Sequence, residues 1–199
     1  FAPVKIAGSD WQKQWVADIF LSGGIMGFAL TESGAGSNAV AMSATARREG
    51  DEYILNGGKT FITNGDCADV IATFAVTDKE KGAKGITAFL LPKDTPGFTV
   101  GEHEDKMGIR CVHTNSLFFD EVRLPAKYRL GEEGEGFKIA MKILDDSRPC
   151  TGASAVGIAQ AALDEAVAYS KTREVFGRPI CDNQAIAFML ADMEIQVQA

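Results

Sequence analysis

FALTESGAGS, residues 28–37, is the part of this sequence that says most about the molecule, and FITN, residues 61–64, is its counterpart further along. The first segment is an apolar run that breaks into Thr, Glu and a Gly-Ala-Gly-Ser turn. The second is an apolar and hydroxyl-bearing cluster that ends a strand-like stretch. Small residues let a ligand approach the backbone, and hydroxyls can point at its polar edge. Each segment alone is explained equally well by a strand end followed by a loop, and the first is not a GxGxxG phosphate turn, because no βαβ unit surrounds it.

Composition and charge exclude several classes of protein. The chain has 199 residues, of which 46% are hydrophobic and 24% charged, as in a globular protein of one or two domains. Its formal net charge is -7, with Lys and Arg dispersed, so we expect no nucleic-acid partner and no binding to an anionic membrane. The longest small apolar run, Ala153–Leu163, is too short to span a bilayer, so we expect no membrane insertion.

The cysteines and histidines do not have the spacing of metal ligands. The sequence contains no CxxC pair, so we expect no metal site and free thiols in a reducing compartment. We interpret these side chains as structural or incidental: His103, His113, Cys67, Cys111, Cys150 and Cys181.

Three stretches of the chain differ in pattern. Residues 1–27 carry Trp11, Trp15, Ile19 and Phe20 at helical spacing after a cap region at 8–10, which is typical of the end of a helical domain. Residues 28–130 hold short strands with turn signals between them, which suggests an antiparallel barrel or sandwich. The expected strands are Ala44–Glu49, Glu52–Leu55, Lys59–Thr63, Val70–Thr77, Ile86–Leu91 and Ser116–Val122.

Two further features of the pattern make specific predictions. Asn56-Gly57 predicts a tight hairpin turn before the strand Lys59–Thr63. Residues 131–199 are predicted to be helical, in one stretch around 137–144, a second from Ala153 to about Thr172 and a third from near Asp182 that still runs at Ala199. We therefore expect the chain to stop inside a helical domain.

A longer series of motifs follows the same order as in a known family. Its members are Thr31-Glu32, GAGS (34–37), GDEYILNG (50–57), Lys59, FITN (61–64), KMGIR (106–110), FDEVRLP (119–125), LGEEG (130–134), REVFG (173–177), QAI (184–186) and LADM (190–193). From residue 9 onward the chain resembles the acyl-CoA dehydrogenases. The resemblance implies an α+β fold: an antiparallel β-barrel middle domain over 28–130, the end of an N-terminal helical domain over 1–27, and the first part of a C-terminal helical domain over 131–199.

By the same resemblance, FAD lies between the barrel and the last domain. Thr63 would hydrogen-bond flavin N5 and Thr31 the pyrimidine edge, while Arg173 would reach the pyrophosphate of a neighbouring subunit, which implies a homodimer or homotetramer. Arg173 has a simpler explanation as a cation near a helix C-terminus. The full set of expected cofactor-binding residues is Phe28, Leu30, Thr31, Gly36, Ser37, Phe61, Ile62, Thr63, Arg173, Phe176 and Gln184.

The resemblance also implies a site for the CoA thioester. Asp145 and Arg148 match positions that line its pocket, and Ser37 would lie near the CoA arm; alternatively, Asp145 and Arg148 form a solvated helix face. Ser147 stands where some members place the catalytic Glu, so we expect the carboxylate base beyond Ala199 and no catalytic residue within this chain.

Three residues depart from the family pattern. Ser33 stands in place of a common Pro, Asn38 in place of Asp, and Phe61 in place of the usual Trp beside the flavin. Phe61 keeps an aromatic wall but lacks the indole N–H.

The implied activity is α,β-dehydrogenation of an acyl-CoA to a trans-2-enoyl-CoA in fatty-acid β-oxidation, with hydride passing to flavin N5. An electron-transferring flavoprotein would reoxidise the flavin, in a bacterial cytoplasm or a mitochondrial matrix. The 199 residues alone would be inactive. An acyl-CoA oxidase, an enoyl-CoA reductase and a non-catalytic interaction remnant remain alternatives, and acyl chain length cannot be read from these residues.

Overall fold

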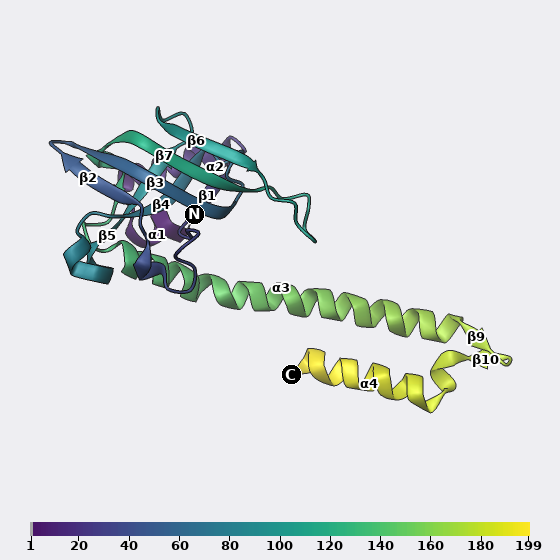
Figure 1. Ribbon diagram of the computed structural model, residues 1–199. Coiled ribbons are helices and arrows are strands. Elements are labelled where there is room, and N and C mark those ends of the chain that lie inside the picture. Colours follow the sequence, from purple (N-terminus) through teal and green to yellow (C-terminus); the bar gives the residue numbers. More distant parts are fainter. Residues whose placement is uncertain (1) are drawn as a thin grey trace. The chain divides into compact units, whose positions relative to one another are not determined.

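The computed structural model describes residues 2–199, which form two compact units that divide between Ile143 and Leu144 (Figure 1). The first unit begins with two helices, α1 (Ala2–Ala7) and α2 (Asp10–Leu21). A capping box starts α2: the Ser9 hydroxyl accepts from the Gln12 amide at 3.3 Å, and the Gln12 side chain accepts from the Ser9 amide at 2.9 Å. This confirms the expected helix and its cap region.

Helix α2 is fixed to the end of the sheet by one buried side chain. The side-chain nitrogen of Gln12, Nε2, donates to the backbone carbonyls of Lys127 and Arg129 at 2.9 and 2.8 Å. Beside it, Trp11 and Trp15 stack at 5.5 Å, and both meet the edge of Tyr128. A polar side chain buried with both donors satisfied and an aromatic cluster together fix the position of the helix.

Eight strands form the sheet of the first unit, in the order β6-β7-β3-β2-β4-β5-β8, with β1 beside β4 (Figure 1). Their bounds are β1 Met26–Ala29, β2 Thr45–Glu49, β3 Glu52–Thr63, β4 Val70–Val76, β5 Ile86–Pro92, β6 Phe98–His103, β7 Thr114–Pro125 and β8 Arg129–Leu130. Short 3-10 turns lie at Ala39–Ala41, Lys79–Gly85 and Ala126–Tyr128. The α+β class is therefore confirmed.

Two details of the expected barrel are wrong. The sheet is not closed, because its path ends at β6 and at β8. Strand β8 has only two residues, which pair with Ala88 and Phe89 of β5. It is also mixed, since β1 and β2 both run parallel to β4. Strand β1 pairs with four residues of β4, Val70 to Thr73, whereas β2 pairs with β4 at one position only, Thr45 with Val76.

The dipeptide Asn56-Gly57 does not make the predicted turn. The turn between β2 and β3 is Gly50-Asp51, so that Glu49 pairs with Glu52, and Asn56-Gly57 lies inside β3 at a shift of register against β7. Gly57 has φ 122°, and a Cβ there would lie 2.8 Å from the Ala44 Cα. The glycine therefore serves a bulge with a close backbone approach.

Strands β4 and β5 form the centre of the hydrophobic core. Every residue from Val70 to Ala75 and from Ile86 to Leu91 is buried. Apart from one threonine in each, Thr73 and Thr87, both strands are apolar, which is typical of strands covered on both faces. Tyr53 of β3 packs edge-on against Phe89 at 5.0 Å. The predicted strands over these segments are confirmed.

The second unit contains most of helix α3 (Gly136–Thr172), the hairpin β9 (Glu174–Val175) and β10 (Arg178–Pro179), a 3-10 turn (Ile180–Asp182) and helix α4 (Gln184–Gln198). The two helical stretches predicted before residue 172 are one helix of 37 residues, which contains Pro149. Proline removes one helical hydrogen bond, but its surroundings are exposed, so water can reach the freed carbonyl. Within residues 2–199, no helix is both long and apolar enough to cross a membrane.

Candidate cofactor site

The FALTESGAGS segment leaves the sheet at the end of β1. Phe28 lies in β1, beside Ala72 of β4, and its ring meets Phe74 edge-on at 5.3 Å. After the buried Leu30, the backbones of Glu32 and Ala35 exchange two hydrogen bonds of 3.1 Å across a tight turn. The turn leaves the next two predicted residues, Gly36 and Ser37, exposed.

A backbone hydrogen bond joins this segment to the second predicted one. The Thr60 amide donates to the Thr31 carbonyl at 2.9 Å. Thr31 therefore lies beside the end of β3, and the structure brings the two segments together although the whole β2–β3 hairpin separates them in sequence.

A buried ion pair fixes the same junction. Lys59 Nζ lies 2.8 Å from Glu32 Oε1, with side-chain exposures of 0% and 5%, and it also donates to the Leu30 carbonyl at 3.2 Å. The other Glu32 oxygen accepts from the Ser43 amide and hydroxyl, and the Ala44 amide donates to Oε1 at 3.1 Å. One carboxylate therefore holds together the turn, β3 and the two residues that precede β2.

The charges of this pair are set by opposing effects. Burial alone would raise the pKa of Glu32, but the hydrogen bonds from Lys59 and Ser43 outweigh burial, so the pKa of Glu32 lies below its ordinary value. Burial lowers the pKa of the Lys59 ammonium, and the contact with Glu32 opposes that shift. Because each charge has its partner and further hydrogen bonds, the pair can remain ionised inside the unit.

A bulge at the end of β3 turns the next side chains outward. The register against β7 shifts between Lys59 and Ile62, and Phe61 has φ 56°. Phe61 is 63% exposed, whereas Ile62 is 2% exposed and belongs to the core. Thr63, exposed like Phe61, pairs with Thr114. A bulky residue at positive φ is uncommon and strained, and such strain gathers at functional sites.

The predicted residues of the first unit divide by exposure: Gly36, Ser37, Phe61 and Thr63 are exposed, whereas Leu30 and Ile62 are buried. Phe61 and Thr63 face solvent, and the strand that carries them is bonded to Thr31. The two segments therefore supply an aromatic side chain, two hydroxyl-bearing residues and an exposed Gly-Ser turn. The side chain of Ile62 enters the core, so its predicted contact with the flavin would have to be made by its backbone.

The remaining predicted residues lie in the second unit. Arg148 Nη1 is 3.3 Å from Asp145 Oδ1, and both side chains are exposed, which is the geometry of a surface ion pair within one helix. Arg173 follows α3, and its backbone carbonyl accepts from the Ile180 amide at 2.8 Å. Phe176, at φ 52°, is fully exposed in the turn of the β9–β10 hairpin, and the exposed Gln184 begins α4.

Sequence reasoning did not assign a function to several groups that the structure brings together. Glu32 and Lys59 are among the motifs that carry the resemblance, but the sequence assigned no function to them. A lysine among the apolar residues of a strand is nevertheless a signal for a buried partner. Asp66, His103 and His113 come from three segments, and no spacing in the sequence links them.

Comparison with known proteins identifies the family of the chain. The family described as "Acyl-CoA dehydrogenase, middle domain" matches residues 27–122, and "Acyl-CoA dehydrogenase, C-terminal domain" matches 134–199. The "Acyl-CoA dehydrogenase, short-chain specific" of Megasphaera elsdenii is 50% identical over 199 residues, which cover 99% of this chain and 52% of that protein.

Solved structures give the same result. Butyryl-CoA dehydrogenase from Megasphaera elsdenii superposes with a TM-score of 0.94 at 49% identity, over 98% of this chain and 52% of that one. A chain from a structure described as the electron-transferring flavoprotein of Acidaminococcus fermentans gives a TM-score of 0.94 at 48% identity, over 98% of this chain and 52% of that one. The present chain spans about half the length of these relatives. With two domain families matched in order along it, the chain belongs to the acyl-CoA dehydrogenase family.

Proposed function

We propose that this chain is the central part of an FAD-dependent acyl-CoA dehydrogenase that converts a short-chain acyl-CoA to the trans-2-enoyl-CoA. One observation supports the proposal: the hydrogen bond from the Thr60 amide to the Thr31 carbonyl joins the two segments, next to the bulge that leaves Phe61 exposed. The names of relatives at 49–50% identity, short-chain specific and butyryl-CoA dehydrogenase, support the substrate class.

The residues of the two segments suit a flat ring with a polar edge. Phe61 offers an exposed aromatic face, Thr31 and Thr63 offer donors, and the small residues Gly36 and Ser37 allow close approach to the backbone. When bound, FAD supplies the acceptor for the hydride from the substrate β carbon. Thr63 would donate to N5 and Thr31 to the pyrimidine edge, so that both stabilise negative charge on the reduced ring. Phe61 would exclude water from it.

Residues of the second unit are assigned to the other ligands. We assign Arg173, Phe176 and Gln184 to the cofactor of a neighbouring subunit, which makes the working protein a homodimer or homotetramer. Asp145, Arg148 and Ser37 are assigned to the CoA thioester, for which Arg148 offers a fork of donors. The carboxylate that removes the α proton is assigned to a residue outside this chain, and an electron-transferring flavoprotein is the proposed acceptor.

The same proposal divides the chain into three parts. Residues 1–27 belong to an N-terminal helical domain, 28–130 to the sheet domain that binds flavin, and 131–199 to a C-terminal helical domain. The two matched families, over 27–122 and 134–199, support these divisions.

The test is an absorbance spectrum of the purified full-length protein, followed by anaerobic addition of butyryl-CoA. We expect a yellow protein whose flavin band bleaches with substrate and recovers with an electron-transferring flavoprotein. Rapid recovery with oxygen alone would indicate an oxidase, and bleaching only by an external reductant, followed by reoxidation with an enoyl-CoA, would indicate a reductase. A colourless protein that takes up no FAD would overturn the proposal in favour of a non-catalytic remnant.

A further inference from the structure

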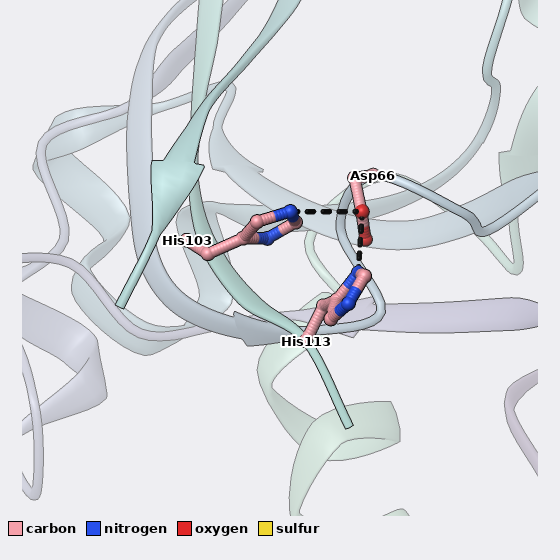
Figure 2. Close-up of side chains that lie close together, drawn as sticks. All are labelled: Asp66, His103 and His113. Atoms are coloured by element: carbon pink, nitrogen blue, oxygen red, sulfur yellow. Dashed lines mark hydrogen bonds and ion pairs between the residues drawn. The ribbon is translucent and has the colours of Figure 1, made fainter. Parts of the chain in front are cut away.

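Two imidazoles and a carboxylate meet at one end of the sheet (Figure 2). Asp66 lies in the turn after β3, His103 is the last residue of β6, and His113 immediately precedes β7. We propose that these three side chains bind one divalent transition-metal ion, of which Zn²⁺ is the representative. The inference departs from the expectation that the histidines are incidental, and it does not depend on the proposed enzyme activity.

The distances in the cluster are close to those that a metal requires. Asp66 Oδ2 lies 2.7 Å from His113 Nδ1 and 3.7 Å from His103 Nε2, and the three ligand atoms all lie within 4.8 Å of one another. Zn–N and Zn–O bonds of about 2.0–2.2 Å in a tetrahedral site place ligand atoms roughly 3.3–3.5 Å apart. The change required is therefore small, and metal binding would replace the direct contact between His113 Nδ1 and Asp66 Oδ2.

Backbone hydrogen bonds hold the three segments in place. The Asn64 amide donates to the His113 carbonyl at 2.9 Å, which joins the turn of Asp66 to the start of β7. His103 is opposite Asn115 in the β6–β7 ladder, and the Glu104 amide donates to the Thr114 carbonyl at 2.9 Å. The three ligands thus come from backbone positions that the sheet already fixes, and their own side chains are exposed and can rotate.

The loop that carries His113 is also closed on itself. Lys106 Nζ donates to the carbonyls of Ile109, at 3.0 Å, and Val112. Arg110 pairs with Asp105 at 2.7 Å. Both cations of the loop therefore already have acceptors within it, and Asp105 offsets the charge of Arg110.

A buried amide lies directly beside one ligand. Asn115 is 1% exposed, and its Nδ2 lies 3.0 Å from the Gly101 carbonyl and 3.1 Å from His103 Nδ1. Its Oδ1 has no hydrogen-bond partner among the described residues. A histidine that binds a metal through one nitrogen normally donates from the other. Half a turn of the Asn115 amide would give His103 Nδ1–H that acceptor and leave Nε2 for the metal, at the cost of the bond to Gly101.

The donor set selects the class of ion. Two nitrogens and one carboxylate oxygen suit Zn²⁺ and its neighbours in the transition series, whereas Mg²⁺ and Ca²⁺ prefer oxygen ligands alone. Three protein ligands at an exposed position leave at least one coordination place for water. The site therefore resembles an open metal site more than a closed structural one.

The experiment uses the full-length, flavin-loaded protein after treatment with a chelator and desalting. Isothermal titration with Zn²⁺ and metal analysis after a second desalting should give one Zn²⁺ per chain. We expect His103→Asn and His113→Asn each to weaken binding by about 10-fold or more, because even a hydrogen-bond partner of a ligand contributes 10–100-fold. Glu102→Gln, which changes an exposed carboxylate of β6 outside the cluster, should bind as the unchanged protein does.

Thermal unfolding gives a second readout that does not depend on activity. Zn²⁺ should raise the midpoint of the unchanged protein and of Glu102→Gln, but not of the double His103→Asn/His113→Asn variant. All three ligands are exposed, so the variants should fold, which circular dichroism without metal checks. No uptake at about 100 μM Zn²⁺, a range in which even weak millimolar sites begin to fill, would overturn the proposal. So would equal uptake by the double variant, or uptake that is lost in Cys67→Ser but kept without the histidines.

Discussion

Lys59 and Glu32 show how one pair of residues can determine the position of a whole loop. Lys59 interrupts an apolar strand, and its ammonium reaches both the Glu32 carboxylate and the Leu30 carbonyl. Glu32 in turn accepts from the backbone amides of Ser43 and Ala44, just before β2. Since Thr31 lies between Leu30 and Glu32, the pair holds the predicted pyrimidine-edge donor against β3. If Thr31 is that donor, we expect the pair to position it, in addition to any contribution to stability.

Breaking this pair from one side should be costly. We expect Lys59→Met to lower the free energy of unfolding by about 3–5 kcal/mol, because it leaves a buried carboxylate without its cation. The double variant Lys59→Met/Glu32→Gln should be less destabilised than the sum of the single variants, by about 0.5–3 kcal/mol of coupling. Urea denaturation followed by circular dichroism measures all four proteins.

The matched control is Lys93→Met. Lys93 pairs with Asp69 at 2.6 Å, but its side chain is half exposed, so its loss should cost no more than about 1 kcal/mol. Equal effects of the two lysine substitutions, or strict additivity of the Lys59 and Glu32 variants, would show that the buried pair is not coupled.

The pKa of Glu32 makes a prediction about acid stability. Its folded-state pKa lies below the ordinary value, so at moderately low pH the unfolded chain binds a proton at Glu32 while the folded chain does not. The resulting stabilisation is complete above the unfolded pKa and is lost as pH falls through the folded pKa. When the pH is lowered from 7 into the acid range, the free energy of unfolding of Glu32→Gln should therefore fall less than that of the unchanged chain. Urea midpoints measure this difference. Parallel curves would contradict the depressed pKa.

Thr63 tests the assignment of the hydride acceptor. In the full-length protein, Thr63→Val should alter the flavin spectrum and slow flavin reduction by roughly 100-fold, which is typical of losing one donor aimed at developing charge. Thr99→Val, on exposed strand β6, should leave both unchanged. The thermal midpoint of Thr63→Val should stay close to that of the unchanged protein, because the side chain is exposed. An unchanged spectrum and rate would remove Thr63 from the site.

At the level of elements, the bulge at the end of β3 explains why two neighbouring residues have different environments. Ile62 continues into the core, while Phe61 is turned outward at φ 56°. The positive φ of a phenylalanine costs about 1–2 kcal/mol. That strain is maintained by the ladder to β7 on both sides of the register shift.

Replacing Phe61 separates strain from function. Phe61→Gly removes the strain and little buried surface, so stability should stay within about 1 kcal/mol of the unchanged protein or rise. FAD retention after gel filtration of the full-length protein should fall, because the aromatic face is lost. Phe118→Gly is the control, since Phe118 is a half-exposed aromatic residue of β7 at ordinary φ and gains nothing from glycine. A larger loss of stability in Phe61→Gly than in Phe118→Gly would contradict the inference that the backbone of Phe61 is strained.

The elements differ in how well the sequence predicts them, for physical reasons. β4 and β5 were predictable because strands buried on both faces are almost entirely apolar, and α2 because Ser9 and Gln12 form a capping box. Strand β6 was missed, since most of its residues are exposed and show no apolar alternation. Asn56-Gly57 was misread because the dipeptide favours a bulge as well as a turn. The proximity of Thr31 to Thr60 depends on long-range pairing, and only the resemblance predicted it.

On the scale of the whole molecule, the two units differ in how much surface they bury. The first has a core built on β4 and β5. In the second, Leu163 and Ser170 are buried, whereas Ile158 of α3 and Phe188 and Ile195 of α4 are largely exposed. Local stability follows the density of buried apolar contacts, so the two units should open independently rather than in one transition.

Helix α3 offers the sharpest test, because it passes from one unit to the other. Ile139, Ala140 and Ile143 are buried, whereas residues 150–159 are exposed. In hydrogen exchange of the 199-residue chain, amides of β4, β5 and the start of α3 should exchange at least about 100-fold more slowly than those of 150–159, which corresponds to ~3 kcal/mol of opening free energy. Equal protection along α3 would mean that the helix opens as one unit. A step near Pro149 would place the boundary of cooperativity within the helix, where burial ends.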